Sequence, residues 1–392
     1  MAFLANKTVN LLYVNYGLLA LAASGGGVFF AAYLIKAGVA IPAVLCAYAL
    51  TNVGRFCLRP LVLVVGKRSG LRPVVIFGTV VMGLQYPVLA LVHGVGPALA
   101  ALVVIATVGE TFYWTAYHTY FGQLSDAKHR GHQTGAREAV AATVGIAAPL
   151  LGGWGLARFG PQATFGAVAA IQMLAFLPLL GAPNVAVVRS ARIDSAAWKP
   201  GFHNYLANGW IGAGIVVSWQ IALFLRLGQS FTAYGGAMAL AALAAAVIGL
   251  ALGRRIDAGR GVSAAWLSFA VLALTIALRA GAASPAMAVA ANAMGALVAC
   301  IYYPTQMTAV YNLAAGAACP LRFHLVAEGG WDIGRGAGCL AAAGLVALGA
   351  PLQATILLSA AGAVWVLILL RGYYAGVAAM ALSPRALASE AE

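Results

Sequence analysis

Charged residues are scarce in this chain. Only 8% of its 392 residues are Asp, Glu, Lys or Arg, whereas soluble domains contain about 25%. Hydrophobic residues make up 63% of the chain, and the mean hydropathy is +0.92. This composition excludes an ordinary soluble domain, and we predict an all-α polytopic membrane protein.

The sequence also lacks the usual signs of an enzyme or a metalloprotein. It has no G-x-x-x-x-G-K-[ST] loop, which argues against ATP as a driving force, and no metal-ligand spacing or nucleophile elbow. Its five cysteines form no C-x-x-C pair, so neither a disulfide frame nor a metal site is indicated. We therefore predict no cofactor, no metal and no enzymatic activity, and we expect the thiols to be small packing residues.

Basic residues outnumber acidic ones, and the net charge is +14. Nucleic acid is not a predicted partner, because no basic stripe with interleaved aromatics lies outside the apolar segments. Fifteen of the 23 Lys and Arg residues fall in loops on the side of the N-terminus, four on the opposite side and four within the apolar segments. By the positive-inside rule we predict that both termini are cytoplasmic and that the protein lies in the cell inner (plasma) membrane.

Twelve segments are long enough to cross a bilayer, which takes about 20 apolar residues. The predicted spans are residues 10–35, 41–64, 73–92, 97–123, 131–157, 161–181, 202–226, 231–252, 262–281, 285–313, 320–349 and 351–373.

The second half of the chain repeats features of the first half. The polar, basic stretch 182–201 lies between the halves and is the predicted cytoplasmic linker. We predict one six-helix bundle in residues 1–181 and a second, with a short tail, in residues 202–392. Two parallel six-helix repeats are a known transporter plan. The matching features are residues 66–72 and 253–260, Tyr113-Trp114 and Tyr302-Tyr303, and Glu138 and Glu328.

Three local patterns accompany this topology. Residues 253–260 follow the loop pattern G-x-x-x-D-[RK]-x-G-[RK], with one residue fewer, and keep Asp257, whereas residues 66–72 are a copy without the aspartate. Residues 125–135 form a polar, glycine-containing turn, and residues 148–153 read Ala-Pro-Leu-Leu-Gly-Gly. With these patterns the whole chain resembles the major facilitator superfamily. The resemblance implies a secondary transporter with twelve helices in two pseudo-symmetric bundles.

The fifth span resembles the family's antiporter signature, whose core is G-P-x-x-G-G. Here alanine replaces the first glycine, Pro149 and the pair Gly152 and Gly153 are kept, and Gly145 lies near an upstream position. The resemblance implies export. The alternative is a kinked, tightly packed helix, because proline interrupts helical hydrogen bonding and glycines permit close approach.

Glu110 lies near the middle of the predicted span 97–123, with Trp114 and His118 on the same helical face. An ionisable residue inside a membrane helix is by default a functional candidate. Because this face brings no permanent positive charge, desolvation would favour the protonated carboxyl, and we predict Glu110 as the main proton carrier. The alternatives are a permanently neutral acid and a fixed ion pair used for packing.

Two further groups are predicted to take part in proton coupling. His118, Arg137 and Glu138 lie at similar depths and are expected to cluster, with a structurally satisfied histidine as the alternative. The second group is Glu328 and Asp332 on the eleventh span.

Arginines inside the spans are the predicted gating residues. Arg335 shares a helical face with Glu328 and Asp332, so these three can pair with one another or line water. In the resembled fold the second and eleventh helices touch, and we predict an Arg59–Glu328 bridge that acts as a cytoplasmic latch. A static ion pair is the alternative. The predicted gating set is Arg55, Arg59, Arg137 and Arg335.

Aromatic and amide residues mark four helices that the resemblance places around a central cavity. Such a wall suits an amphipathic organic solute, although aromatics also serve as packing and membrane-interface residues. The predicted cavity residues are Tyr13, Asn15, Tyr16, Trp114, Tyr117, Trp219, Gln220, Tyr302, Tyr303 and Gln306.

The sequence thus predicts a monomeric secondary active transporter whose partners are a small-molecule substrate, protons and the lipid bilayer. Proton-coupled export of a small organic, amphipathic solute by alternating access is the first hypothesis. Proton-coupled import or lipid flipping is the alternative within transport. An intramembrane enzyme or a non-transporting sensor is the alternative of another class.

Overall fold

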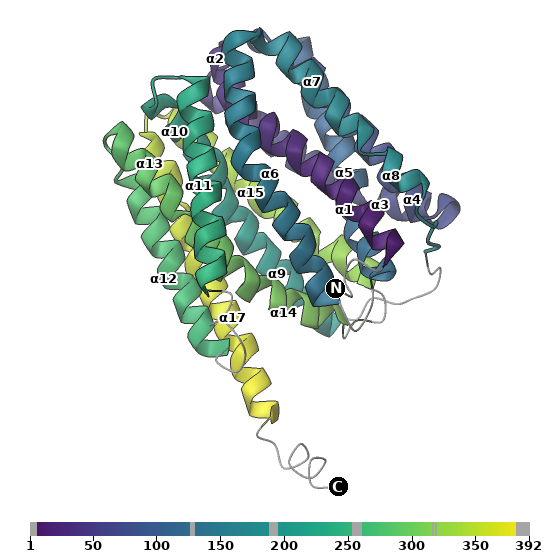
Figure 1. Cartoon of the computed structure of the whole chain (residues 1–392). Coiled ribbons are helices and arrows are strands. Elements are labelled where there is room, and N and C mark those ends of the chain that lie inside the picture. The colour runs from purple at the N-terminus through teal and green to yellow at the C-terminus, as the bar shows by residue number, and fades with distance from the viewer. Residues whose placement is uncertain are drawn as a thin grey trace, which may run out of the picture.

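The computed structural model describes residues 6–125, 130–187, 195–252, 261–315, 317 and 320–381, and every regular element in these residues is a helix. Figure 1 shows the first-half helices, in purple to blue, gathered on one side, and most second-half helices, in green to yellow, on the other. The loop 253–260 and Asp126 of the predicted turn lie outside the described residues.

The first half contains six successive helical segments, of which the first and the last are interrupted. They are α1 (Lys7–Gly25) with η2 (Gly27–Phe29) and α2 (Phe30–Lys36), α3 (Ile41–Ser69), α4 (Leu71–Ala90), α5 (Pro97–Leu124), α6 (Arg130–Arg158), and α7 (Gly160–Leu174) with α8 (Leu177–Leu180).

The second half also contains six, and two of these pass through a π-helical turn, η3 or η4. They are α9 (Ser195–Gly212) with η3 (Ala213–Ser218) and α10 (Trp219–Arg226), α11 (Phe231–Leu252), α12 (Gly261–Ala280), α13 (Pro285–Met294) with η4 (Val298–Tyr302) and α14 (Tyr303–Ala315), α15 (Pro320–Ala347), and α16 (Leu352–Leu357) with α17 (Ser359–Ala381).

Each predicted span corresponds to one of these segments, so the predicted all-α membrane fold is confirmed. Eleven segments are long and apolar enough to cross a membrane. The remaining segment, α15, which is the eleventh in chain order, is 28 residues long but carries Glu328, Asp332 and Arg335 in its middle. Such charges are tolerated where they face the protein interior, and both carboxylates are buried.

Local sequence explains several helix ends. The Asn6 side chain caps α1 by accepting a hydrogen bond from the Val9 amide at 3.1 Å. Proline stands in the first turn of α3, α5 and α7, where its missing N–H does no harm. Gly70, at φ 81°, adopts the left-handed conformation that turns the chain between α3 and α4.

The two halves meet mainly along two helix pairs, α3 with α15 and α6 with α11, and α5 with α15 and α2 with α10 add smaller contacts. In chain order the two main pairs are the second with the eleventh helix and the fifth with the eighth, so they are equivalent under the pseudo-symmetry of the bundles. We call the α3–α15 contact the charged seam and the α6–α11 contact the glycine seam, from the residues described below.

The first part of the predicted linker packs against the first half. The Tyr120 hydroxyl donates to the Pro183 carbonyl oxygen at 2.7 Å, and the Leu71 amide donates to the Val185 carbonyl oxygen at 2.9 Å. Helix α9 begins at Ser195, inside the stretch 182–201. The division into two domains and a linker stays a prediction.

Candidate functional site

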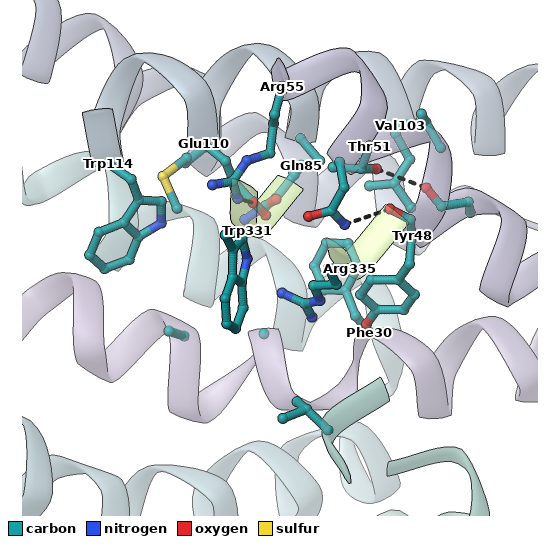
Figure 2. Close-up of a pocket in the computed structure, with 18 of the residues that line it drawn as sticks. Phe30, Tyr48, Thr51, Arg55, Gln85, Val103, Glu110, Trp114, Trp331 and Arg335 are labelled. Carbon is teal, nitrogen blue, oxygen red and sulfur yellow. Dashed lines mark hydrogen bonds and ion pairs between the residues drawn. The ribbon is translucent and has the colours of Figure 1, made fainter. Parts of the chain in front are cut away.

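A cavity of about 490 Å³ is lined by residues from both halves (Figure 2). Its size lies in the range of about 300–1,000 Å³ that is usual for small-molecule sites. Its aromatic lining residues are Phe30, Tyr48, Tyr86, Trp114, Tyr205 and Trp331. Its polar and charged lining residues are Thr51, Asn52, Arg55, Arg59, Gln85, Glu110, His118, Gln172, Gln220, Glu328 and Arg335.

One wall of this cavity carries a charged cluster, which we define as Arg55, Arg59, Glu110, Glu328 and Asp332. Helix α3 supplies the two arginines, α5 supplies Glu110, and α15 supplies the other two carboxylates. Asp332 is fully buried and pairs with both arginines, so it stands at the centre of the cluster.

Arg59 makes the main connection across the charged seam. Its Nε atom donates to Asp332 Oδ2 at 2.5 Å, and its Nη1 atom donates to Glu328 Oε2 at 3.1 Å and to Thr115 Oγ1 at 3.2 Å. The predicted contact between Arg59 and Glu328 is therefore confirmed. Its action as a latch stays a prediction.

Glu110 is not the lone carboxyl that its own helical face indicated. Arg55 Nη1 donates to Glu110 Oε2, and Arg55 Nε lies 3.1 Å from Asp332 Oδ1. The expectation of an environment without positive charge is wrong, because the arginine comes from α3, which helix-local spacing does not reveal. The desolvation argument for Glu110 is lost with this correction, and an ion pair, the alternative, is what the structure shows. The role of Glu110 in proton coupling stays a prediction, and the side chain lines the cavity and is 28% exposed.

The charged cluster contains one carboxylate more than it has guanidinium groups. With every member ionised it has a net charge of −1, and a single proton makes it neutral. Buried charges are tolerated when they are paired and are unfavourable when they are left over. The cluster is therefore suited by its composition to exchange one proton.

Two histidines lie beside the cluster. The His118 ring stacks on Trp114 and on His324, with ring centroids 5.7 and 6.4 Å apart. His324 Nδ1 lies 3.6 Å from Glu328 Oε1. The structure thus places His118 next to α15.

Arg137 and Glu138 form a separate pair. Arg137 Nη2 donates to Glu138 Oε1 at 2.5 Å, and the arginine lies over the rings of Tyr16 and Phe121, 4.7 and 4.9 Å from their centroids. The Glu138 side chain is 54% exposed. Arg137 and Glu138 come together as predicted, while His118 contacts Trp114 and His324 instead.

Arg335 lines the cavity outside the charged cluster. Its guanidinium carbon lies 5.6 Å from the centre of the Tyr48 ring and 5.7 Å from the centre of the Trp331 ring. Figure 2 shows Arg335 between these two aromatic side chains. Of the two predicted arrangements, pairing with Glu328 and Asp332 or lining water, the first is not seen, because both carboxylates pair with arginines of α3 and Arg335 lies on the cavity wall.

Trp114 and Gln220 are the predicted cavity residues that line this cavity. The other eight lie outside its wall, and several are held by hydrogen bonds within one half. Their part in substrate binding stays a prediction. Four of them are hydrogen-bonded: Asn15 to Tyr113 and the Ala175 carbonyl oxygen, Trp219 to Asn292, Tyr302 to Asn208, and Gln306 to Asn204 and Asn208. Tyr16 stacks on Tyr117, and Tyr303 lies against Tyr302. Tyr13 is buried.

The glycines of the fifth helix make backbone contacts on both sides of α6. A Cβ atom at Gly152 would lie 1.9 Å from the Gly25 carbonyl oxygen of α1. One at Gly153 would lie 2.4 Å from the Phe231 carbonyl oxygen of α11, whose Gly235 in turn faces the Pro149 carbonyl oxygen. This geometry explains Gly152 and Gly153 by packing.

Sequence reasoning missed Tyr48, Asn52 and Trp331 as cavity residues. A signal was present on α3, where Tyr48, Asn52, Arg55 and Arg59 follow one another at helical spacing and share one face. A similar signal was present on α15, where Glu328, Trp331 and Arg335 stand at i, i+3 and i+7 and share one face.

The comparisons with known proteins agree with this architecture. The family model described as the Major Facilitator Superfamily matches residues 12–320. A POT family transporter solved in complex with 5-aminolevulinic acid is similar with a TM-score of 0.68 and 10% identity, over 92% of this chain and 95% of that chain. A mutant of the nucleoside transporter NupG is similar with a TM-score of 0.64 and 12% identity, over 94% of this chain and 100% of that chain. A mutant of a peptide transporter POT is similar with a TM-score of 0.63 and 13% identity, over 93% of this chain and 94% of that chain. Such identities show the fold alone. No match was found among curated proteins.

Proposed function

The chain belongs to the Major Facilitator Superfamily, and from this premise we propose that it is a proton-coupled secondary active transporter. It moves a small organic, amphipathic solute by alternating access and has no enzymatic activity. The observation that carries the proposal is the charged cluster, which forms part of the cavity wall and also joins the two halves.

Opening the cavity on the side of this cluster requires the two halves to separate along the charged seam. The ion pairs of Arg59 with Glu328 and Asp332 oppose that movement. Protonation of a carboxylate, or a rearrangement of its arginine, weakens the seam and shifts the population between the two states. A proton can therefore change which side of the membrane the cavity faces.

Glu110 is the best candidate for the proton carrier. Its side chain is 28% exposed, against 8% for Glu328 and 0% for Asp332, so it has the readiest access to water in the cavity. Glu110 pairs with Arg55, whereas Asp332 is held by both arginines of α3. Glu328 and Asp332 are better suited to hold the seam, with His118 and His324 beside them.

The direction of transport is inferred from the sequence of α6. The resemblance of this helix to an antiporter signature favours export. Close helix packing explains Gly152 and Gly153 of the same helix as well. Reconstitution into liposomes decides both direction and coupling. An imposed pH gradient should drive net movement of a labelled amphipathic solute against the proton flux for export by antiport, and with the proton flux for proton-coupled import. A protonophore that collapses the gradient should abolish that net movement. Flux that does not respond to the gradient would contradict proton coupling.

We propose that both termini are cytoplasmic and that the monomer resides in the inner membrane. Cysteine substituted at Ser195, the first residue of α9, or at Ser389, which lies outside the described residues, should react with an impermeant thiol reagent only after the membrane is permeabilised. Labelling of both positions in intact cells would invert the topology.

A further inference from the structure

We propose that the transported solute carries a negatively charged group, a carboxylate, a sulfonate or a phosphate monoester, and that Arg335 binds this group. The inference rests on the proposed transport function and specifies its substrate class. It starts from the position of Arg335 on the cavity wall, between Tyr48 and Trp331.

Arg335 forms no ion pair within the part of the protein that the structure describes. The four acidic side chains there are all paired with other arginines. An unpaired cation in a desolvated site is unfavourable, and an anionic ligand offsets that cost. The pairs are Glu110 with Arg55, Glu138 with Arg137, Glu328 with Arg59, and Asp332 with Arg55 and Arg59.

The surroundings of Arg335 favour binding of a planar anion. Two aromatic rings lie within cation–π distance of its guanidinium carbon, and such contacts use none of its N–H donors. The Nε atom is buried and has no hydrogen-bond partner among the described residues. A guanidinium edge matches a carboxylate or phosphate with two parallel hydrogen bonds, which a lysine does not reproduce.

The rest of the cavity favours an apolar body attached to that anion. Phe30, Trp114 and Tyr205 contribute aromatic surface, and the volume of about 490 Å³ accommodates a small organic molecule. The carboxylates Glu110 and Glu328 lie on the cavity wall in the charged cluster, where they are engaged by arginines. The expected ligand is therefore an amphipathic organic anion with its charge at Arg335.

The test compares matched pairs of compounds that differ in charge alone. The purified full-length protein is titrated with aromatic carboxylates, such as benzoate and indole-3-acetate, and with their carboxamides, together with aromatic sulfonates and phosphate monoesters. Binding is measured by the shift in thermal unfolding and by the change in tryptophan fluorescence, since Trp114 and Trp331 line the cavity. Anions should bind, and the carboxamides should bind about tenfold or more weakly, as expected for loss of a charged hydrogen bond.

Three variants separate binding from folding. Arg335→Gln should weaken anion binding by about tenfold or more and remove the preference over the carboxamide. Arg335→Lys should retain part of the affinity, because lysine keeps the positive charge but lacks the paired N–H donors of a guanidinium group. Arg371→Gln is the matched control, since Arg371 is an exposed arginine that lies over Trp266, 5.2 Å from its ring centroid, and is not part of the cavity wall. It should bind anions as the unmodified protein does.

The proposal is overturned if no anion of the panel binds, if carboxamides bind as tightly as carboxylates, or if Arg335→Gln binds anions unchanged. The selectivity of the unmodified protein tests the anion site even where Arg335→Gln does not fold. Failure of the proposed function looks different. A neutral solute driven by a pH gradient would leave proton-coupled transport standing and remove the anion site, whereas Arg335-dependent anion binding with flux that does not respond to pH would do the reverse.

Discussion

The two main contacts between the halves are equivalent by pseudo-symmetry, yet they are built from opposite chemistry. In the charged seam, arginines of α3 meet carboxylates of α15 inside the protein. In the glycine seam, α6 and α11 approach until backbone meets backbone at Gly153 and Gly235. Helix α11 contains no charged residue between Phe231 and Leu252.

This difference separates two tasks that the proposed alternating access requires. Ion pairs between side chains respond to protons and to charged ligands, so the charged seam can be switched. Backbone contacts at glycines depend on shape alone, so the glycine seam can keep the halves aligned while the other seam changes. We interpret the first as the regulated contact and the second as the guide along which the halves move.

A substitution at Glu110 gives the strongest test of the difference between the two seams. Glu110→Gln keeps the shape of the side chain but cannot release a proton, so transport driven by a pH gradient should be abolished, while solute binding and exchange persist. The measurement is flux in liposomes with and without the gradient. Glu138→Gln is the comparison variant: this carboxylate was also predicted to take part in proton coupling, but it is 54% exposed and paired outside the cavity, so its change should leave the gradient dependence in place. If Glu110→Gln transports with the unmodified pH profile, the proton carrier lies on α15 instead.

Removing one partner from the ion pairs of the charged seam should also destabilise the protein strongly. Arg59→Ala removes the partner of Glu328 and one partner of Asp332, and stranding a buried charge typically destabilises by about 3–5 kcal/mol. Combining Arg59→Ala with Glu328→Ala should destabilise the protein less than the sum of the single changes.

Thermal unfolding in detergent and cysteine accessibility of the cavity measure that coupling. Additive effects of the two substitutions would show that Arg59 and Glu328 do not act together, and the charged seam could not then be the switch. A thiol-reactive probe should also reach the cavity more readily from the side of the cluster in the single variant.

The glycine seam should respond to bulk rather than to charge. In Gly235→Ala the new Cβ atom would lie 2.3 Å from the Pro149 carbonyl oxygen, so α6 and α11 must move apart. Overpacking of this kind costs about 1–3 kcal/mol. The loss of thermal stability should be the same at all pH values between about 6 and 8, because no ionisable group is involved. A pH-dependent loss would mean that the two seams are not chemically distinct.

The helices were predictable from the sequence because membrane spans are recognisable by their apolar length, and even α15 kept enough apolar residues to be recognised. Its charges also led correctly to Glu328 and Arg59, since the resemblance brings the second and eleventh helices together. These inferences use periodicity within one helix or a known pairing of two helices.

The sequence could not reveal contacts that depend on how a third helix is rotated. Arg55 reaches Glu110 across from α3 to α5, and nothing in the spacing on α5 indicates it. Aromatic and amide residues of α1, α5, α10, η4 and α14 were expected in the cavity, but many satisfy one another inside a half, as Tyr302 and Asn208 do. Polar groups in a membrane bundle require hydrogen-bond partners, and the partner is as often a neighbouring helix as a solute.

The smallest effect is expected at Gly145, and it distinguishes packing from a dedicated export motif. A Cβ atom there would meet only the Ala242 Cβ atom at 3.8 Å and the Ser24 Oγ atom at 3.9 Å, which are ordinary contacts. Because alanine is favoured over glycine within helices by about 0.5–1 kcal/mol, Gly145→Ala should be neutral or slightly stabilising in thermal unfolding. Transport should be unchanged, in contrast to Gly235→Ala on the same seam. If Gly145→Ala folds normally but loses flux or reverses its dependence on the pH gradient, the glycine acts in the transport cycle, and the glycine seam is more than a guide.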